Sequence, residues 1–132
     1  MTQIKIVYEG SLRTHSVYEG GQQEIVTDAS QEKMFSPTDL LAAALGSCVL
    51  TLMGIAAERL KVDVTGLRLT LDKEMAKTPS RRMGRIVMHI YCPRSFDPDV
   101  QQKLETAGSH CPVHQSLHPD VKQEFFFHWG EP

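Results

Sequence analysis

Residues 36–60 read SPTDLLAAALGSCVLTLMGIAAERL, and this stretch decides the fold. Ser36 is a favoured N-cap residue, Pro37 suits the first helical position, and Asp39 places an acidic group in the first turn. Apolar residues then recur at intervals of three and four, which is the spacing of one face of an α-helix. We therefore expect a long helix that begins near Ser36 and ends in the polar residues after Ala57.

The middle of this helix is rich in small residues, namely Ala42, Ala43, Ala44, Gly46 and Ser47. Small side chains give a helix a slim surface, so another backbone, including that of a second copy of the chain, can come close. The apolar run over 40–57 is long enough to suggest a membrane span. Because strand patterns precede and follow it, we expect instead the buried central helix of a soluble protein.

Alternating polar and apolar residues flank the helix on both sides and predict short strands. The expected strands cover residues 3–9, 12–17, 23–27, 64–75, 84–92 and 121–129. The first three form a β-meander, and the later ones are expected to be antiparallel. A second helix is expected over 97–108 and a short third helix over 112–117. This order predicts an α+β fold in a single domain that spans residues 1–132.

The composition is that of an ordinary globular protein. Of its 132 residues, 41% are hydrophobic and 23% are charged, and the formal net charge is −2. This balance gives no electrostatic reason to bind nucleic acid or an anionic membrane. The N-terminus alternates polar and apolar residues, so we expect no secretory signal and a cytoplasmic location. In that reducing compartment three cysteines do not make a disulfide framework.

Each cysteine is therefore open to three interpretations: a core residue, a metal ligand or a reactive thiol. Cys48 lies on the apolar face of the long helix, where a small buried hydrophobe is the default. Cys92 ends a strand and is expected to be a core residue. Cys111 precedes Pro112 at the N-cap of the short helix, where unpaired N–H groups favour the thiolate. From position alone we expect the pKa of Cys111 to be lowered and this thiol to be the more reactive.

A metal site is the main alternative use of these residues. Cys111 and His114 have the spacing of two ligands on one helical turn, and His110, His118 and Cys48 could complete a set of four. A structural zinc site usually shows two closely spaced pairs, and the sequence has only one. We therefore expect no metal and no other cofactor.

The segment over 36–48 resembles the helix signature of the OsmC/Ohr family, the osmotically inducible and organic hydroperoxide resistance proteins. The later segment CPVHQSL, over 111–117, resembles the second signature of that family. Both occur in the family's order, and the resemblance covers nearly the whole chain. It implies an intertwined homodimer, with the two long helices packed at its centre, that reduces hydroperoxides with thiols.

The resemblance also implies roles for individual residues. Cys48 matches the cysteine that attacks the peroxide and Cys111 the resolving cysteine, which reverses the order suggested by helix position. Arg13 matches an arginine of the N-terminal sheet that stabilises the thiolate. In the family a glutamate near the start of the long helix holds this arginine, but Thr38 stands there in this chain. The neighbouring Asp39 either substitutes for it or serves only the helix dipole.

The reaction implied by the resemblance is a sulfenate and disulfide cycle between Cys48 and Cys111, reopened by a small dithiol such as reduced lipoamide. The absent glutamate indicates a looser OsmC-like branch, with Glu58 as a more remote replacement. The alternative function is that of an OsmC-fold binding protein for a small electrophilic or disulfide ligand, with little peroxidase turnover.

Overall fold

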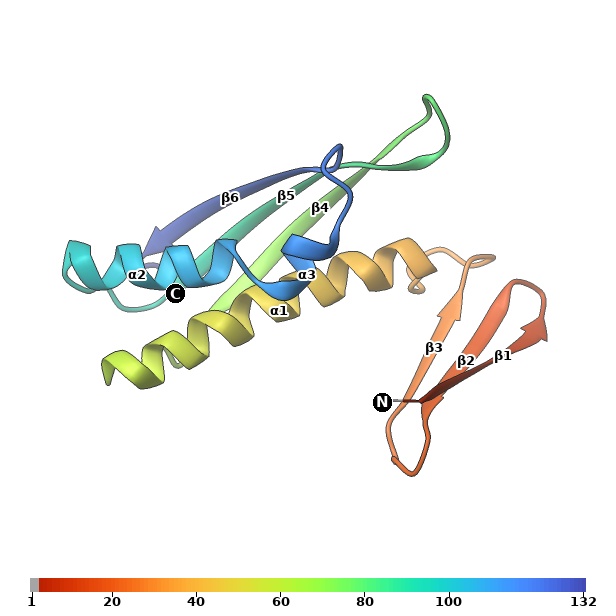
Figure 1. Cartoon of the computed structure of the whole chain (residues 1–132), viewed down its shortest axis with the longest axis horizontal. Coiled ribbons are helices and arrows are strands. Elements are labelled where there is room, and N and C mark those ends of the chain that lie inside the picture. The colour runs from red at the N-terminus through yellow and green to blue at the C-terminus, as the bar shows by residue number, and fades with distance from the viewer. Residues whose placement is uncertain (1–2) are drawn as a thin grey trace. The chain divides into compact units, whose positions relative to one another are not determined.

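The computed structural model describes residues 3–132. Its contacts divide the chain into two compact units, the first ending at Leu41 and the second running from Ala42 to Pro132. The elements follow the order of three strands, a long helix, two strands, two short helices and a last strand (Figure 1). This order confirms the α+β class expected from the sequence.

The first unit contains the expected β-meander. Strands β1 (Ile4–Gly10), β2 (Arg13–Tyr18) and β3 (Glu24–Asp28) form an antiparallel sheet in the order β1-β2-β3. Neighbouring side chains of a strand point to opposite faces, so the register assigns residues to faces. One face carries apolar side chains that are 41–64% exposed, namely Ile4, Ile6, Tyr8, Tyr18 and Ile25. The other face carries charged side chains, among them Arg13, His15, Glu24 and Asp28.

Helix α1 (Pro37–Leu60) begins where the sequence predicted. The backbone N–H of Asp39 donates to Ser36 Oγ at 3.2 Å, and that of Ser36 donates to Asp39 Oδ2 at 3.0 Å. Each residue thus satisfies an N–H group of the other at the helix start. By length and composition α1 could cross a membrane, a criterion that core helices of soluble proteins also meet. Its buried residues follow the expected spacing: Ala42, Leu45, Gly46, Val49, Met53 and Ala57.

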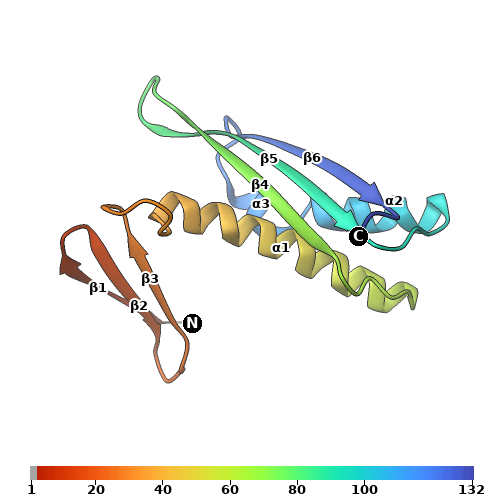
Figure 2. The same cartoon turned by 180° about the vertical axis from the view of Figure 1, so that it is seen from behind.

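The second unit contains a sheet in the order β4-β5-β6 (Figure 2). Strand β4 (Arg68–Ala76) pairs with β5 (Arg82–Cys92) in antiparallel register, as expected. Strand β6 (Lys122–Trp129) pairs with β5 in parallel register, so the expectation of antiparallel strands is wrong for this last one. The reason is the connection: helices α2 (Pro98–Ser109) and α3 (Pro112–Ser116) carry the chain back before β6 begins.

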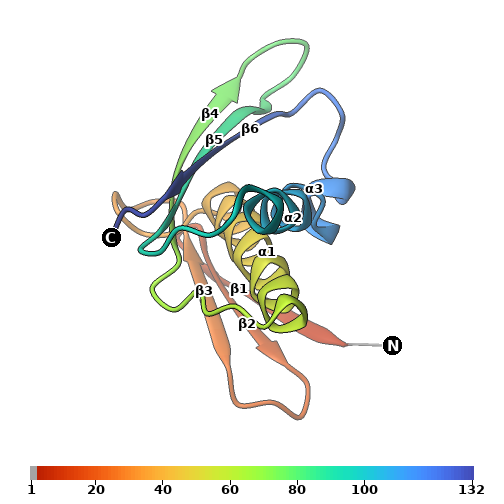
Figure 3. The same cartoon turned by 90° about the vertical axis from the view of Figure 1, so that its left-hand side faces the viewer.

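The three helices lie on one face of this sheet (Figure 3). The core between the helices and the sheet joins Leu45, Val49 and Met53 of α1 to Ile86, Met88 and Ile90 of β5. The slim surface of α1 matters here, because a Cβ at Gly46 would lie only 3.2 Å from Leu69 Cδ2 of β4. The opposite face of the sheet carries Thr70, His89, Phe126 and other side chains that alternate with the inward-facing ones.

Candidate functional site

Cys48 lies in the middle of α1, one residue before the fully buried Val49. Its side chain is half-buried and packs against the edge of the core. The position follows from the helix period, since Leu45 and Val49 define the buried stripe and Cys48 lies beside it. A thiol at this border contacts the core on one side and keeps access from the other.

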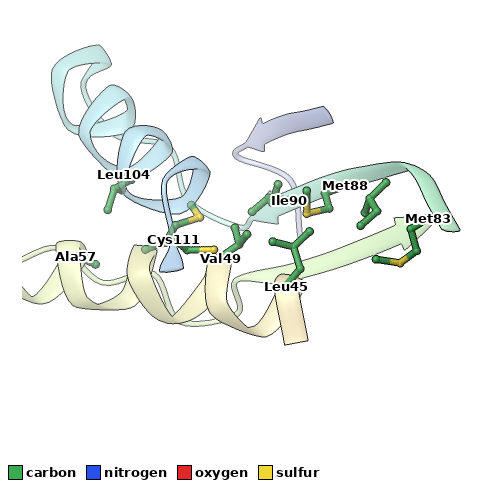
Figure 4. Close-up of a cluster of buried hydrophobic side chains, with 10 residues drawn as sticks. Leu45, Val49, Ala57, Met83, Met88, Ile90, Leu104 and Cys111 are labelled. Carbon is green, nitrogen blue, oxygen red and sulfur yellow. The ribbon is translucent and has the colours of Figure 1, made fainter. Parts of the chain in front are cut away.

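Cys111 lies in the link between α2 and α3 and is fully buried. It occupies the N-cap of α3 with an extended backbone, and Pro112 follows at the first helical position. The backbone N–H of His114 donates to Cys111 Sγ at 3.4 Å. Figure 4 shows the side chain of Cys111 among those of Val49 and Leu104, which belong to α1 and α2.

The two cysteines are brought together, since Cys48 packs against the core cluster that contains Cys111 and lies close enough to raise the pKa of the Cys111 thiol. Both are reduced thiols in this structure. Residues far apart in the sequence therefore place two sulfur atoms side by side, one half-buried and one fully buried. This arrangement allows a disulfide to form between them after one is oxidised.

The pKa of the Cys111 thiol is raised, which corrects the expectation from its N-cap position. Burial is the largest cause, since the thiolate loses its hydration. The N–H of His114 lowers the pKa, as the sequence predicted, and the neighbouring Cys48 raises it further. The N–H groups of a five-residue helix stabilise the Cys111 thiolate too weakly to offset its complete removal from water. Cys111 is therefore held as a neutral thiol.

Two of the three histidines proposed as metal ligands with Cys111, His114 and His110, make other contacts. His114 Nδ1 hydrogen-bonds to Gln123 Oε1 of β6, and Gln123 Nε2 donates back to the His114 carbonyl at 3.4 Å. His110 Nδ1 bonds to the carbonyl of Thr106 at 2.9 Å. Within residues 3–132, no three His, Cys, Asp or Glu side chains gather in a way that could hold a metal ion. The paired bonds of His114 and Gln123 fasten α3 to β6.

Arg13 belongs to the charged face of the first unit, where two carboxylates contact it. Its Nη1 lies 3.7 Å from Asp28 Oδ2, and its Nε lies 3.4 Å from Glu9 Oε1. Asp28 is buried, whereas the Arg13 side chain is 44% exposed. Ser30 donates its hydroxyl and its backbone N–H to Asp28 Oδ1, and these bonds lower the pKa of Asp28, with Arg13 adding to the effect.

Sequence reasoning considered Asp39 and Glu58 as acidic partners of Arg13 and missed Asp28. The Asp39 carboxylate binds the N–H of Ser36 at the helix start, as a cap does. A signal for Asp28 was available, because the register of the predicted hairpin places it directly opposite Arg13. Arg13 and Cys48 belong to different units, so the role of Arg13 toward the thiol stays a prediction.

Comparison with known proteins supports the same assignment as the motifs. A family model described as OsmC-like protein matches residues 30–125. A solved structure from Psychrobacter arcticus, described as a putative osmotic stress induced and detoxification response protein, is 37% identical, with a TM-score of 0.90 over 97% of this chain and 96% of the other. A search of curated proteins finds no match.

More distant structures share the fold. An organic hydroperoxide resistance protein OsmC from Legionella pneumophila is 15% identical, with a TM-score of 0.74 over 97% of this chain and 96% of the other. The organic hydroperoxide resistance protein OhrB of Bacillus subtilis is 14% identical, with a TM-score of 0.69 over 96% of this chain and 97% of the other.

Proposed function

Since the chain belongs to the OsmC-like protein family, we propose that it is a thiol-dependent peroxidase that reduces organic hydroperoxides. The observation that carries this proposal is the proximity of Cys48 to the buried Cys111 in the core of the second unit. The family suggests a redox or peroxide-resistance role in general. The pairing of one accessible and one buried thiol is what favours a peroxidase cycle.

The different burial of the two thiols supports a division of roles. Cys48 is half-buried and can be reached by a peroxide, whereas Cys111 is fully buried and has a raised pKa. A buried neutral thiol is a poor first nucleophile, because the thiolate is the reactive form. Cys48 therefore attacks the peroxide and Cys111 resolves the product, in agreement with the family motif and not with helix position.

The proposed cycle has three steps. The Cys48 sulfur attacks the outer peroxide oxygen, the O–O bond breaks, and the alcohol leaves with the proton of the thiol. Cys111 then attacks the sulfur of the resulting Cys48 sulfenic acid, a disulfide forms, and water leaves with the Cys111 proton. A small dithiol of the lipoyl type reduces this disulfide by thiol exchange and is itself oxidised to a cyclic disulfide.

Arg13 and its acidic partners are assigned a supporting role. We propose that the Arg13 guanidinium stabilises the Cys48 thiolate and that Asp28 holds Arg13 in position, in place of the family glutamate that Thr38 replaces. Asp28 fits this role because its carboxylate is buried, bonded to Ser30 and paired with Arg13. Asp39 is assigned to the start of α1, which fixes the helix that carries Cys48.

We also propose that the protein acts as a homodimer in the cytoplasm. Each chain forms a single domain, and its two units fold together with a second copy of the chain. The apolar face of the first sheet supports a dimer. Ile6 is 62% exposed and Tyr8 is 64% exposed, on the same face of β1. A sheet face of this kind is normally covered, because its exposure to water is unfavourable. A second copy of the chain is the covering surface that we propose.

The test is consumption of an alkyl hydroperoxide with dihydrolipoamide as reductant. We expect Cys48→Ser to reduce turnover at least about a hundredfold. Cys111→Ser should reduce a first equivalent of peroxide but accumulate the Cys48 sulfenic acid in place of the disulfide. Cys92→Ala is the matched control, since Cys92 is a buried cysteine of β5 outside the pair. Turnover of the wild type no faster than that of Cys48→Ser would instead favour a binding protein for a small electrophile or disulfide.

A further inference from the structure

Gln123 is a polar residue in an otherwise apolar row. The side chains of β6 that point toward the helices alternate along the strand, and besides Gln123 they are Phe125, Phe127 and Trp129. An amide in such a row is unfavourable unless its polar atoms find partners. A single residue, His114 of α3, supplies partners for both the oxygen and the nitrogen of this amide.

The two bonds between Gln123 and His114 fix the orientation of both side chains. Gln123 Nε2 lies 3.4 Å from the His114 carbonyl, which can only accept, so the amide nitrogen donates there. The amide oxygen Oε1 then faces His114 Nδ1 at 2.5 Å and accepts from its N–H. The ring also lies edge-on against Phe125, with centroids 5.6 Å apart. His114 is therefore held by its side chain and by its backbone at once.

The backbone N–H of the same histidine points at the Cys111 sulfur. His114 N lies 3.4 Å from Cys111 Sγ, and the next N–H, that of Gln115, donates to the Cys111 carbonyl at 3.0 Å. Helix α3 has only five residues, too few for a helix that is stable on its own. The direction of the His114 N–H therefore depends on what α3 is fastened to, and the Gln123 side chain fastens it to β6.

We propose that Gln123 is a positioning residue for the resolving step and that, through its two bonds to His114, it holds the His114 N–H on the Cys111 sulfur. The inference rests on the proposed function, since it takes Cys111 as the resolving thiol. Negative charge develops on this sulfur as it loses its proton and attacks Cys48, and a donor already in place stabilises that charge without having to move. Burial raises the pKa of the Cys111 thiol, and the His114 N–H is the first of the effects that lower it.

The groups around Cys111 that titrate come from three elements. Cys48 of α1 raises the pKa of Cys111, and the His110 ring, which follows α2, lies edge-on to that of His114 at 6.2 Å. On β6 the charged neighbours of Gln123, Lys122 and Glu124, point to the opposite face of the sheet. The Gln123 amide is thus an uncharged support, and its removal changes no charge near the two sulfurs.

The test measures the attack by Cys111 with a probe that needs no peroxide. One equivalent of the aromatic disulfide DTNB reacts with the accessible Cys48, releases one thionitrobenzoate and leaves the other half bound to Cys48 as a mixed disulfide. Cys111 then attacks the Cys48 sulfur, its proton passes to water, and the second thionitrobenzoate leaves as the Cys48–Cys111 disulfide forms. The absorbance of the full-length chain's reaction mixture gives the rate of this second release. A Cys92→Ala background removes the third cysteine.

Gln123→Met keeps the length of the side chain and removes both bonds to His114. We expect the second release to slow about tenfold at neutral pH and its pH profile to move to higher pH, because a hydrogen bond to a charged sulfur is weakened. The first release, from Cys48, should be unchanged. His114→Phe keeps a ring against Phe125 and should slow the second release equally. The double variant should be no slower than either single variant, because the two residues act as one unit.

Gln101→Met is the matched control. Gln101 is also half-buried, and its Oε1 accepts from the N–H of Phe96 at 2.8 Å, close to the start of α2. This variant loses a bond between a side chain and the backbone in the same unit, so it should lower the free energy of unfolding without changing the second release. Circular dichroism checks that each variant folds, and His114→Phe provides the decisive comparison if Gln123→Met does not.

The outcomes separate this inference from the proposed function. An unchanged rate and pH profile of the second release in Gln123→Met, or an equal slowing in Gln101→Met, would overturn the role of Gln123. A wild type that releases no second thionitrobenzoate would overturn it as well. A wild type that releases the second thionitrobenzoate, with the expected slowing in Gln123→Met, but consumes no alkyl hydroperoxide would remove the peroxidase and leave the role of Gln123 intact.

Discussion

Gly108 of α2 lies directly against Met53 of α1. A Cβ at position 108 would lie 2.8 Å from Met53 Cγ and 3.2 Å from Val49 Cγ1, closer than side chains normally approach. Both of these neighbours are fully buried and have no room to move aside. Gly108 precedes Cys111 by three residues, so this contact sets how closely the link that carries Cys111 approaches the helix that carries Cys48.

Gly108→Ala is therefore expected to push α2 away from α1. Overpacking of a filled core typically costs about 1–3 kcal/mol of the free energy of unfolding, measured by urea denaturation. The separation should also slow formation of the Cys48–Cys111 disulfide after peroxide treatment, followed by mass spectrometry. Thr106→Ala is the control, since it places an alanine in the same helix at an exposed position. Equal disulfide rates in the two variants would contradict this role of Gly108.

The raised pKa of Cys111 predicts a loss of stability at alkaline pH. The folded protein holds this thiol neutral, whereas in the unfolded chain it ionises near its ordinary pKa of 9.0. Below pH 9 the neutral Cys111 thiol makes its full contribution to the free energy of unfolding. As the pH rises from 9 toward the higher pKa of the folded state, the free energy of unfolding falls by no more than about 1.4 kcal/mol per pH unit for this one group.

Urea denaturation in a reducing buffer from pH 7 to pH 10 measures this effect. The difference between the wild type and Cys111→Ser isolates it, because the other titrating groups are common to both proteins. We expect the wild type to lose its advantage over the variant as the pH rises through 9. A difference in the free energy of unfolding between the two proteins that stays constant from pH 7 to pH 10 would contradict this prediction.

The sequence was sufficient where the information is local. The start of α1 follows from Ser36 and Asp39, which cap the helix with their own atoms. The burial of Val49 and Met53 follows from helical spacing. The direction of β6 was not predictable in this way, because an alternating pattern is the same in a parallel and an antiparallel strand.

The site shows the same limit. The N-cap position of Cys111 was visible in the sequence, and the N–H of His114 does lower its pKa. The larger and opposite effect of burial comes from residues such as Val49 and Leu104, which are distant in the sequence. Helix position therefore gave the wrong direction for the pKa of Cys111, and the order in which the two thiols react stays a prediction.

Asp28 and Asp39 can be distinguished as partners of Arg13. If Asp28 positions the guanidinium, Asp28→Asn should lower kcat/KM for an alkyl hydroperoxide about fivefold, because the residues act as one network. The Arg13 side of this ion pair is 44% exposed and therefore screened by water, so we expect the free energy of unfolding to change less than the activity does. Asp39→Asn should do the opposite, since it removes a negative charge from the first turn of α1, at a cost of about 0.3–1 kcal/mol, and leaves Arg13 paired with Asp28.

A double-mutant cycle with Arg13→Ala provides the control. In an Arg13→Ala background Asp28→Asn should have no further effect on kcat/KM, whereas the effect of Asp39→Asn on stability should persist. Activity lost in Asp39→Asn at unchanged stability would instead show that Asp39 substitutes for the family glutamate. Additive effects of Arg13→Ala and Asp28→Asn would remove Asp28 from the mechanism.

The apolar face of the first sheet predicts how the proposed dimer can be broken. Ile6→Lys places a charge in the middle of this face, beside Ile4 and Tyr8, and a buried unpaired charge is strongly unfavourable at an interface. We expect light scattering to give twice the chain mass of 14.8 kDa for the wild type and the single chain mass for Ile6→Lys. Lys5→Glu changes the charge on the opposite face of the same strand and should leave the dimer intact. A monomeric wild type at micromolar concentration would rule out the homodimer, and a dimeric Ile6→Lys would move the interface to another surface.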